Sequence, residues 1–321
     1  MRTRTKVWFI IAAFLVLIGC FLFLGIMSML EWDFAKLSTF KYETNGYEIT
    51  EKFKNISIIT DTADILFVPS ETPKASVVCH EQKNTKHSVT VNNGKLIIKI
   101  VDTRKWYEHI GINLGTPKIT IYIPQDEYGT LFVKSSTGNV EIPKVFKFKN
   151  IDITESTGNV TNYASASENI IIKTSTGYIC VEDVSANTLD LSVSTGEVAV
   201  SNVTCESDVK INVSTGKANL TNIECKKVVS NGDTGDIYLN NTIATEKFFI
   251  ERSTGDIKFN KCDAAEIFVE TDTGDVTGSL LTDKIFVVQT DTGNVNVPKT
   301  ATGGKCEITT STGDINIRIK Q

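Results

Sequence analysis

Apolar residues recur at fixed positions around ten Thr-Gly pairs from residue 131 onwards. Neighbouring glycines of these pairs stand 19 or 20 residues apart. In every repeat one apolar residue lies seven positions before the glycine and another lies two positions after it. Alternating apolar positions on both sides of a turn predict two short strands per repeat, each with one face turned inwards. The glycines are Gly138, Gly158, Gly177, Gly196, Gly216, Gly235, Gly255, Gly274, Gly293 and Gly313.

These repeats predict a parallel β-solenoid. A repeat of 19 or 20 residues cannot bury its own apolar face, so neighbouring repeats must stack and cover one another. Glycine permits a positive φ where the chain turns between sheets, and the Asp, Asn or Ser beside it can hydrogen-bond the turn backbone. We therefore predict an all-β fold over residues 131–321, a single-strand parallel β-helix of about ten coils.

The chain begins with a segment typical of a membrane anchor. An unbroken apolar run covers residues 7–30, and the basic residues Arg2, Arg4 and Lys6 precede it. A helix of this length spans the hydrocarbon core of a bilayer, and its basic side is expected to stay in the cytoplasm. We predict a cytoplasmic tail at 1–6, a single-pass transmembrane helix at 7–30, and an extracellular remainder at the cell membrane.

Two other interpretations of the apolar run compete with a retained helix. Leu17-Ile18-Gly19-Cys20 resembles a lipobox, in which Cys20 would be acylated, although the following residues stay apolar. A cleaved signal peptide would need a shorter apolar core and a cleavage site of small residues. The sequence favours the retained helix and leaves lipidation of Cys20 open.

Residues 31–130 lack the regular repeat. A mixed charged and aromatic stretch at 31–50 predicts a membrane-proximal linker. Short β-type runs at 51–130, separated by turn residues, predict an irregular N-terminal β cap. Within it, residues 61–65 (Asp-Thr-Ala-Asp-Ile) are similar to the later repeat with Ala in place of Gly. At the other end, we expect the last coil to leave Arg318 and Lys320 on an open edge.

Charge and histidine content limit the possible partners and chemistry. The formal net charge is −5, so the chain offers no general basic surface for a nucleic-acid backbone. The three histidines, His80, His87 and His109, all precede the array and are expected at the surface. No Ser-His-Asp constellation can therefore form on the coils, and we expect no cofactor.

One outward column in the later repeats is apolar rather than polar. Six residues before the glycine stand Val229, Phe249, Phe268 and Val287, which we expect to align as an apolar stripe. A monomer rarely leaves such a stripe bare. Either a loop or the cap of the same chain covers it, or it binds a partner protein, a lipid or a second copy. The sequence leaves both possibilities open.

Acidic turns in the later repeats raise the question of a metal site. Asp272 and Asp275 are expected to stack near Asp291, which makes these residues weak candidates for calcium binding. Calcium takes six to eight oxygens in an enclosing geometry, and the glycine-rich nonapeptide of calcium-binding β-rolls is absent from the sequence. The Asp-Thr-Gly tripeptides do not indicate a protease, because serine fills the same column in most repeats. No metal is predicted.

The seven cysteines show no zinc-binding spacing. Cys205 and Cys225 each follow their glycine by nine residues in consecutive repeats. Stacking would bring their Cα atoms within disulfide range. They form either a buried thiol pair or a disulfide, and the sequence does not decide between the two.

The repeat sequence resembles a known family. Ser-Thr-Gly-Asn-Val at 136–140 and 156–160, Ser-Thr-Gly-Asp-Ile at 253–257 and 311–315, and Asp-Ile-Leu-Phe-Val-Pro at 64–69 are similar to the bacterial putative-adhesin family with β-strand repeats. The resemblance covers about residues 40–321. It implies a domain of unknown function, often behind a membrane anchor and in some members associated with envelope-stress systems, and it carries over no catalytic residue.

The sequence predicts a non-enzymatic surface module. Residues 7–30 bind the membrane, and the rod presents a surface for adhesion, for another envelope protein, for a glycan or for self-association. Two alternatives stay open. A carbohydrate-active β-helix enzyme would need a groove lined by acidic and basic residues, and a purely structural spacer would need no binding surface at all.

Overall fold

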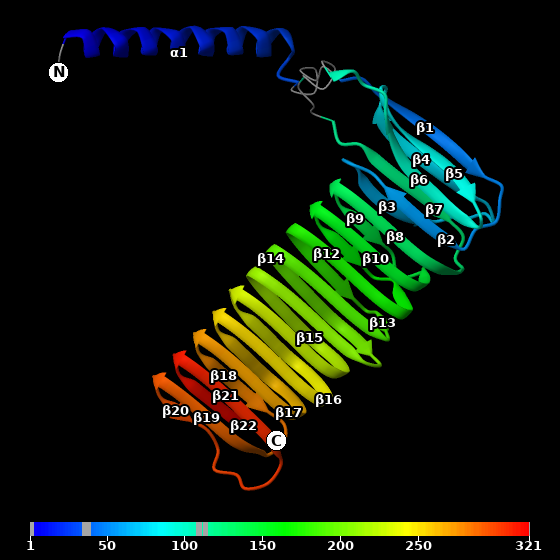
Figure 1. Ribbon diagram of the computed structural model, residues 1–321. Helices are drawn as coiled ribbons and strands as arrows, with labels where there is room; N and C mark the ends of the chain where they lie inside the picture. Colours follow the sequence, from blue (N-terminus) through cyan, green and yellow to red (C-terminus); the bar gives the residue numbers. More distant parts are fainter. Residues whose placement is uncertain (1–2, 34–39, 107–110, 112–114, 321) are drawn as a thin grey trace.

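The computed structural model describes residues 3–33, 40–106, 111 and 115–320, and these form one helix followed by a β body (Figure 1). Helix α1 spans Thr3–Met29, and its stretch Val7–Met29 is long and apolar enough to cross a membrane. From Val7 to Ile26 its side chains are exposed on every side, as expected of a helix that faces lipid. A signal sequence would meet the same criteria of length and composition.

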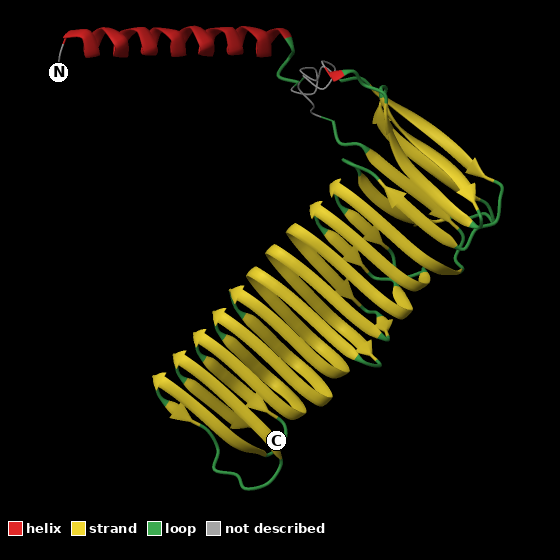
Figure 2. Cartoon of the chain, in the orientation of Figure 1, coloured by secondary structure: helices red, strands yellow, loops and turns green. Residues whose placement is uncertain are grey.

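The β body is a rod of stacked coils (Figure 2). Successive coils pair in parallel, with Leu131 beside Ile151, Ile151 beside Ile170, and Ile170 beside Leu189. The predicted solenoid is confirmed. Its central strands are β8 (Glu127–Thr137), β9 (Val140–Ile142), β10 (Lys147–Thr157), β11 (Val160–Asn162), β12 (Ser165–Glu182), β13 (Ser185–Ala186), β14 (Thr188–Cys205), β15 (Asp208–Thr234), β16 (Ile237–Thr254), β17 (Ile257–Thr273) and β18 (Val276–Leu280).

The Thr-Gly turn depends on close backbone contact between coils. Gly216 has a φ of +133°, and a Cβ atom there would collide with the carbonyl oxygen of Gly196 in the preceding coil. The residue after the glycine adds a ladder of hydrogen bonds. Asp275 Oδ1 accepts the backbone N–H of Asp314 at 2.8 Å, and Asp314 Oδ1 accepts that of Asn294 at 2.7 Å. The turn therefore requires glycine first and a short acceptor side chain next.

A second corner of the coil uses asparagines in the left-handed conformation. Asn202, Asn222 and Asn241 have φ values of 53°, 55° and 48°. Their side chains form a ladder, because Asn222 Nδ2 donates to Asn202 Oδ1 at 2.8 Å and Asn241 Nδ2 donates to Asn222 Oδ1 at 2.9 Å. Asparagine tolerates this conformation better than most residues. The column six positions after the glycine is thus a turn that the sequence analysis missed.

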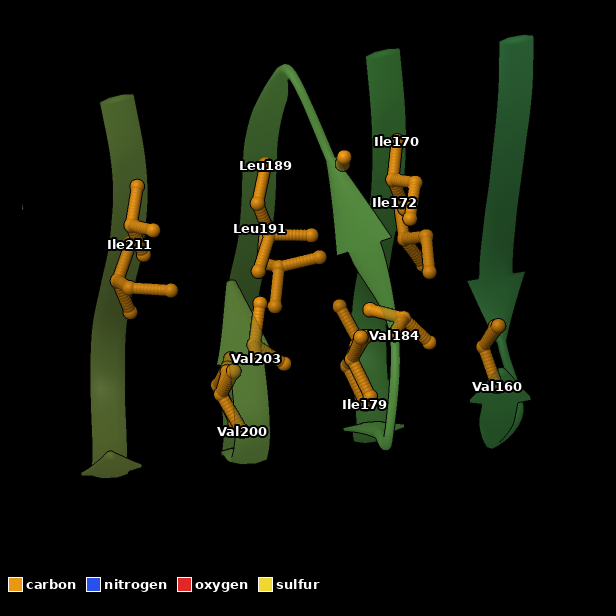
Figure 3. Close-up of a cluster of buried hydrophobic side chains, with 14 of the residues drawn as sticks. Val160, Ile170, Ile172, Ile179, Val184, Leu189, Leu191, Val200, Val203 and Ile211 are labelled. Atoms are coloured by element: carbon orange, nitrogen blue, oxygen red, sulfur yellow. The ribbon is translucent and has the colours of Figure 1, made fainter. Parts of the chain in front are cut away.

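Inward-facing side chains fill the interior of the rod. Ile170 and Ile172 of one coil lie beside Leu189 and Leu191 of the next, and all four are fully buried (Figure 3). Ile170 and Leu189 belong to the column seven residues before the glycine, and Ile172 and Leu191 lie two residues further along the same inward face. Each coil shields the apolar face of its neighbours, which is why one repeat alone would not hold its shape.

The N-terminal region continues the stack. Strands β2 (Asn55–Ile59) and β3 (Asp64–Pro69) pair in parallel with β8 and β9 on one side, and with β6 (Lys95–Asp102) and β7 (Lys118–Ile123) on the other. Gly138 packs on the carbonyl of Ala63, so residues 61–65 form a turn of the array. Three antiparallel strands cover this end, namely β1 (Tyr42–Ile49), β4 (Ala75–Gln82) and β5 (Thr85–Asn92).

Strand β1 lies within the stretch expected to be a linker. It pairs with β4 along its whole length, so the part of 31–50 without regular structure is shorter than expected. Only Ile49 of this strand is buried, which agrees with the lack of an apolar period in its sequence. The domain boundaries 51–130 for the cap and 131–321 for the array stay predictions. The coil formed by β2 and β3 pairs with the array although it precedes residue 131.

The last two coils are exchanged in the stack. Strand β21 (Gly304–Thr312) lies between β17 and β19 (Lys284–Thr292), and β22 (Ile315–Ile319) lies between β18 and β20 (Val295–Asn296). The C-terminal coil is therefore internal, and the coil of β19 and β20 forms the end of the rod (Figure 1). The expectation that the last coil ends the rod was wrong, because the chain builds the end coil first and then folds back. The recorded pairing of β20 with β22 covers only Ile315 and Asn316, so Arg318 has a recorded strand partner on the β18 side alone.

Local contacts account for this exchange. Lys284 is 3% exposed, and its Nζ lies 2.6 Å from Asp263 Oδ1, which ties the start of the end coil to an earlier one. Gly304 packs against the carbonyl of Ala265, where any side chain would collide. At the C-terminus, the N–H of Lys320 donates to the carbonyl of Leu280 at 2.8 Å. The contacts of Gly304 and Lys320 hold the returning coil directly against β17 and β18.

Candidate binding surface

The apolar stripe begins as an aromatic pair on the outer face of neighbouring coils. Val229 pairs with Phe249 and Phe249 with Phe268 across β15, β16 and β17, and all three are half-buried. The two phenyl rings stack with centroids 5.0 Å apart and planes 10° apart. Lys247 Nζ lies 5.3 Å from the Phe249 centroid and 5.7 Å from that of Phe268. The surface is thus apolar with one cation beside the rings.

Val287 does not join this stripe directly. Phe268 pairs with Glu307, and Val287 pairs with the other side of Glu307. The expected run of four apolar residues is therefore interrupted, because the C-terminal coil is inserted between β17 and β19. A carboxylate now separates the aromatic pair from the end coil.

The end coil carries an apolar surface of its own. Ile285, Val287 and Val295 are 45%, 50% and 47% exposed. Phe286 and Val288, which take inward positions, are only partly buried because no further coil covers them. Strand β19 pairs with β21 on one edge, and no partner strand is recorded on its other edge among the described residues. The distal end of the rod therefore exposes both backbone and apolar side chains.

The acidic candidates lie on separate coils. Asp275 uses its carboxylate to accept the N–H of Asp314, and the inserted coil separates Asp272 and Asp275 from Asp291. Among the described residues, these three do not form a group close enough to share a metal ion. The expected stacking of Asp272 and Asp275 near Asp291 was wrong, for the same reason as at Val287. The carboxylate of Asp275 stabilises the turn.

The stacked cysteines are free thiols. Cys205 and Cys225 are both buried in consecutive coils, and neither is bonded to the other in this structure. Burial raises the pKa of each thiol to about 12. Such thiols are protonated at neutral pH and therefore react slowly.

Two of the three histidines lie within the described residues. His80 stacks on Tyr42 with ring centroids 5.2 Å apart. His87 is only 4% exposed, so the expectation of a surface position was wrong for it. It lies on the inner face of the β4–β5 hairpin, which the irregular cap sequence did not reveal. His109 lies outside the described residues.

Glu155 is an unusual inward-facing carboxyl. It lies between Ser135 and Thr174 in neighbouring coils and is 2% exposed, and neither carboxyl oxygen has a hydrogen-bond partner among the described residues. Burial, with a smaller contribution from the charge of Asp64, raises its pKa from 4.5 to about 8. The folded chain therefore keeps a proton that the unfolded chain loses.

This proton predicts a loss of stability at alkaline pH. The folded state binds more protons than the unfolded state between the two pKa values, so stability falls as pH rises from about 4.5 to about 8 and levels off above that. We expect Glu155→Gln to raise the melting temperature at about pH 9 and to leave it nearly unchanged at about pH 5. Thermal melts of the detergent-solubilised chain measure this. Glu141→Gln, at an exposed position of β9, is the control, and an equal response of both variants would contradict the prediction.

A cleft of about 840 Å³ lies at the cap end, where no sequence motif indicates a site. Its apolar wall includes Ile49, Phe53 and Tyr128, while Lys52 and Lys74 add positive charge at its lining. The rings of Phe53 and Tyr128 stack with centroids 6.0 Å apart. Its volume falls in the range of small-molecule sites, although salt bridges such as Lys54 with Asp126 also occupy its rim.

The family model described as Toastrack DUF4097 matches residues 53–277 and 207–321, which is more than half of the chain. The chain belongs to the Toastrack DUF4097 family. This is a domain family of unknown function. The resemblance of the repeats also implied a domain of unknown function, and that part of it is confirmed. No curated protein sequence matches the chain.

Several solved structures are similar over most of their length but share little sequence. The "Putative lipid binding protein" of Parabacteroides distasonis is 16% identical, with 86% of this chain and 97% of that one covered and a TM-score of 0.49. A "putative adhesin" of Bacteroides fragilis is 15% identical, with 87% and 97% covered and a TM-score of 0.35. A "putative adhesin" of Parabacteroides distasonis is 9% identical, with 87% and 98% covered and a TM-score of 0.42. At these values the likenesses support no functional argument.

Proposed function

We propose that this chain is a membrane-anchored extracellular binding module without catalytic activity. Helix α1 anchors it as a single-pass protein with the N-terminus in the cytoplasm, and the rod carries the binding surface away from the membrane. The observation that carries the proposal is the half-buried pair Phe249 and Phe268 on the outer face, with Lys247 beside it. Val229 extends this surface, and Val287 belongs to a separate apolar area at the end coil.

The geometry of the rings favours an apolar protein surface over a sugar. Their centroid separation of 5.0 Å matches the spacing of neighbouring strands, so the rings stack along the rod. Each ring then covers one face of the other, and the ring edges point outwards. A sugar would need a free ring face, whereas a protein side chain can pack on edges. Lys247 offers a partner carboxylate a point of attachment.

The cap does not cover the stripe. Strands β1 to β7 close the opposite end of the rod, away from β15 to β17 (Figure 1). Among the described residues, the ring contacts recorded for Phe249 and Phe268 are with each other and with Lys247. This supports a partner surface over intrachain packing.

The test removes the aromatic pair. We expect Phe249→Ser with Phe268→Ser to weaken binding by on the order of tenfold or more, because buried aromatic anchors dominate interface energies. Full-length protein in detergent is first measured for self-association by sedimentation, and then for retention of purified envelope proteins. Phe132→Ser is the matched control, since Phe132 occupies the same outward column in an earlier coil without an aromatic neighbour.

The outcomes separate the alternatives. Binding that survives in the double variant would refute the stripe as the anchor. Release of new reducing or unsaturated ends from envelope polysaccharides would favour the carbohydrate-active enzyme. Function that survives deletion of whole coils would favour the structural spacer.

A further inference from the structure

The β4–β5 hairpin brings three different metal-binding side chains together inside the cap. Cys79 and Glu81 alternate along β4 and face inwards, and His87 comes from β5. They are 0%, 0% and 4% exposed. One ligand atom from each lies within 4.8 Å of the other two. Among the described residues, these are the three that meet this condition.

We infer that Cys79, Glu81 and His87 form a zinc site that clamps the N-terminal strands onto the first coil. A thiolate, an imidazole and a carboxylate are all ligands of Zn²⁺, which accepts this mixed set in tetrahedral geometry. Calcium and magnesium prefer oxygen alone and do not suit a thiolate. This site goes beyond the proposed binding function and does not depend on it.

The buried carboxylate supports a cation at this position. Glu81 Oε2 accepts the backbone N–H of His87 at 2.6 Å and lies 2.7 Å from His87 Nδ1. Among the described residues, His87 is the ion-pair partner recorded for Glu81. A carboxylate without solvent needs a balancing positive charge. A metal ion bound by both Nδ1 and Oε2 would supply this charge in place of their hydrogen bond, and the two atoms would then move apart from 2.7 Å to about 3.3 Å for tetrahedral Zn²⁺. The Cys79 thiol would be the third ligand.

The surrounding residues hold the ligands in place as the outer partners of a metal site do. His87 Nε2 lies 2.9 Å from Thr60 Oγ1, so a proton on Nε2 leaves Nδ1 free to coordinate. Asn45 Nδ2 donates to Glu81 Oε1 at 2.8 Å, which leaves Oε2 to face the metal. Thr60 follows β2 of the first coil, and Asn45 belongs to β1. A metal ion here would connect the β4–β5 hairpin to the first coil through Thr60 and to β1 through Asn45.

A fourth ligand position is available beside Glu81 and His87. A cavity of about 110 Å³ is lined by Glu81, Thr85 and His87. Thr85 Oγ1 is buried and has no hydrogen-bond partner among the described residues. A cavity of this size holds water. A zinc-bound water would complete the tetrahedron and satisfy Thr85 Oγ1.

Cobalt is the probe, because Co²⁺ replaces Zn²⁺ and reports its ligands in the absorption spectrum. The full-length chain in detergent is stripped with a chelator and titrated with CoCl₂ alone. We expect one Co²⁺ per chain, a thiolate-to-cobalt charge-transfer band in the near ultraviolet, and loss of that band when ZnCl₂ is added. We also expect ZnCl₂ to raise the melting temperature of the stripped protein.

Variants assign the ligands. Cys79→Ser should abolish the charge-transfer band and the thermal response to ZnCl₂, and His87→Gln should weaken Co²⁺ binding at least about tenfold. The paired variant Cys205→Ser with Cys225→Ser tests the stacked thiols and should keep the band, as should His80→Gln. A folded wild-type chain without a thiolate band, or a band that persists in Cys79→Ser, would overturn the proposal. Cys79→Ser is nearly isosteric, so the test does not depend on whether His87→Gln folds.

Discussion

Replacing Gly216 by alanine is expected to destabilise the rod by at least about 3 kcal/mol. Gly216 has a φ of +133°, which L residues with a side chain rarely adopt, and its added Cβ would collide with the carbonyl oxygen of Gly196. The two coils would have to separate to relieve this collision. Their separation would break the parallel pairing of Thr215 with Thr195, the residues directly before the two glycines. Urea unfolding followed by far-ultraviolet circular dichroism measures the loss.

Gly46→Ala provides the control for this substitution. Gly46 lies in β1, where an added Cβ would meet nothing within 4 Å and φ is not in the left-handed region. We expect a change of about 0.5 kcal/mol or less, of either sign. A loss at Gly216 as small as that at Gly46 would show that the coils can separate cheaply, and the close-contact explanation of the Thr-Gly turn would fail.

Phe248→Ala should cost about 3–5 kcal/mol, whereas Phe249→Ala should cost about 1 kcal/mol. The two residues are neighbours on β16, but Phe248 points inwards and is fully buried, while Phe249 points outwards. The Phe248 ring packs on Phe259, with centroids 6.1 Å apart, so its removal leaves a cavity in the core. Phe249 loses only its stacking on Phe268 and its contact with Lys247.

The same pair separates stability from binding. Each variant is unfolded in urea and is also measured in the binding assay used for the stripe. Phe249→Ala should lose binding with little loss of stability, and Phe248→Ala should show the reverse at temperatures where it stays folded. Equal stability losses in the two variants would contradict the inward and outward assignment that follows from the period of two along the strand.

Local regularity made the solenoid predictable. The glycine column fixed the turns, and the apolar columns on either side, such as Leu189 and Val198, fixed the inward faces, because strands alternate their side chains with a period of two. The same alignment placed Val229, Phe249 and Phe268 on one outward column, as found. The column of Asn202, Asn222 and Asn241 is equally visible in the sequence. Its role as a corner depends on positive φ values, which the residue types alone do not establish.

The cap was much less predictable. The similarity of residues 61–65 to the repeat indicated a turn of the array. The sequences of β1, β4 and β5 do not match the repeat pattern. Cys79, Glu81 and His87 meet only because a hairpin folds antiparallel and buries one face, and no spacing rule for metal ligands describes that geometry. The inward Glu155 was hidden for a related reason, since polar residues at that column look like any other turn residue.

The sequence by itself determined the coil, its turns and its inward faces, because these depend on contacts between residues close in the repeat. It did not determine the order of the coils. Equivalent repeats offer nearly the same pairing surface. Either the coil at 284–296 or the coil at 304–319 could therefore pair with β17 and β18, which cover residues 257–280. Tertiary contacts favour the exchanged order that the structure adopts, since Gly304, which lacks a side chain, packs directly on the carbonyl of Ala265. That exchange separates Val287 from Phe268, separates Asp291 from Asp272, and leaves β19 rather than the C-terminal strand at the end of the rod.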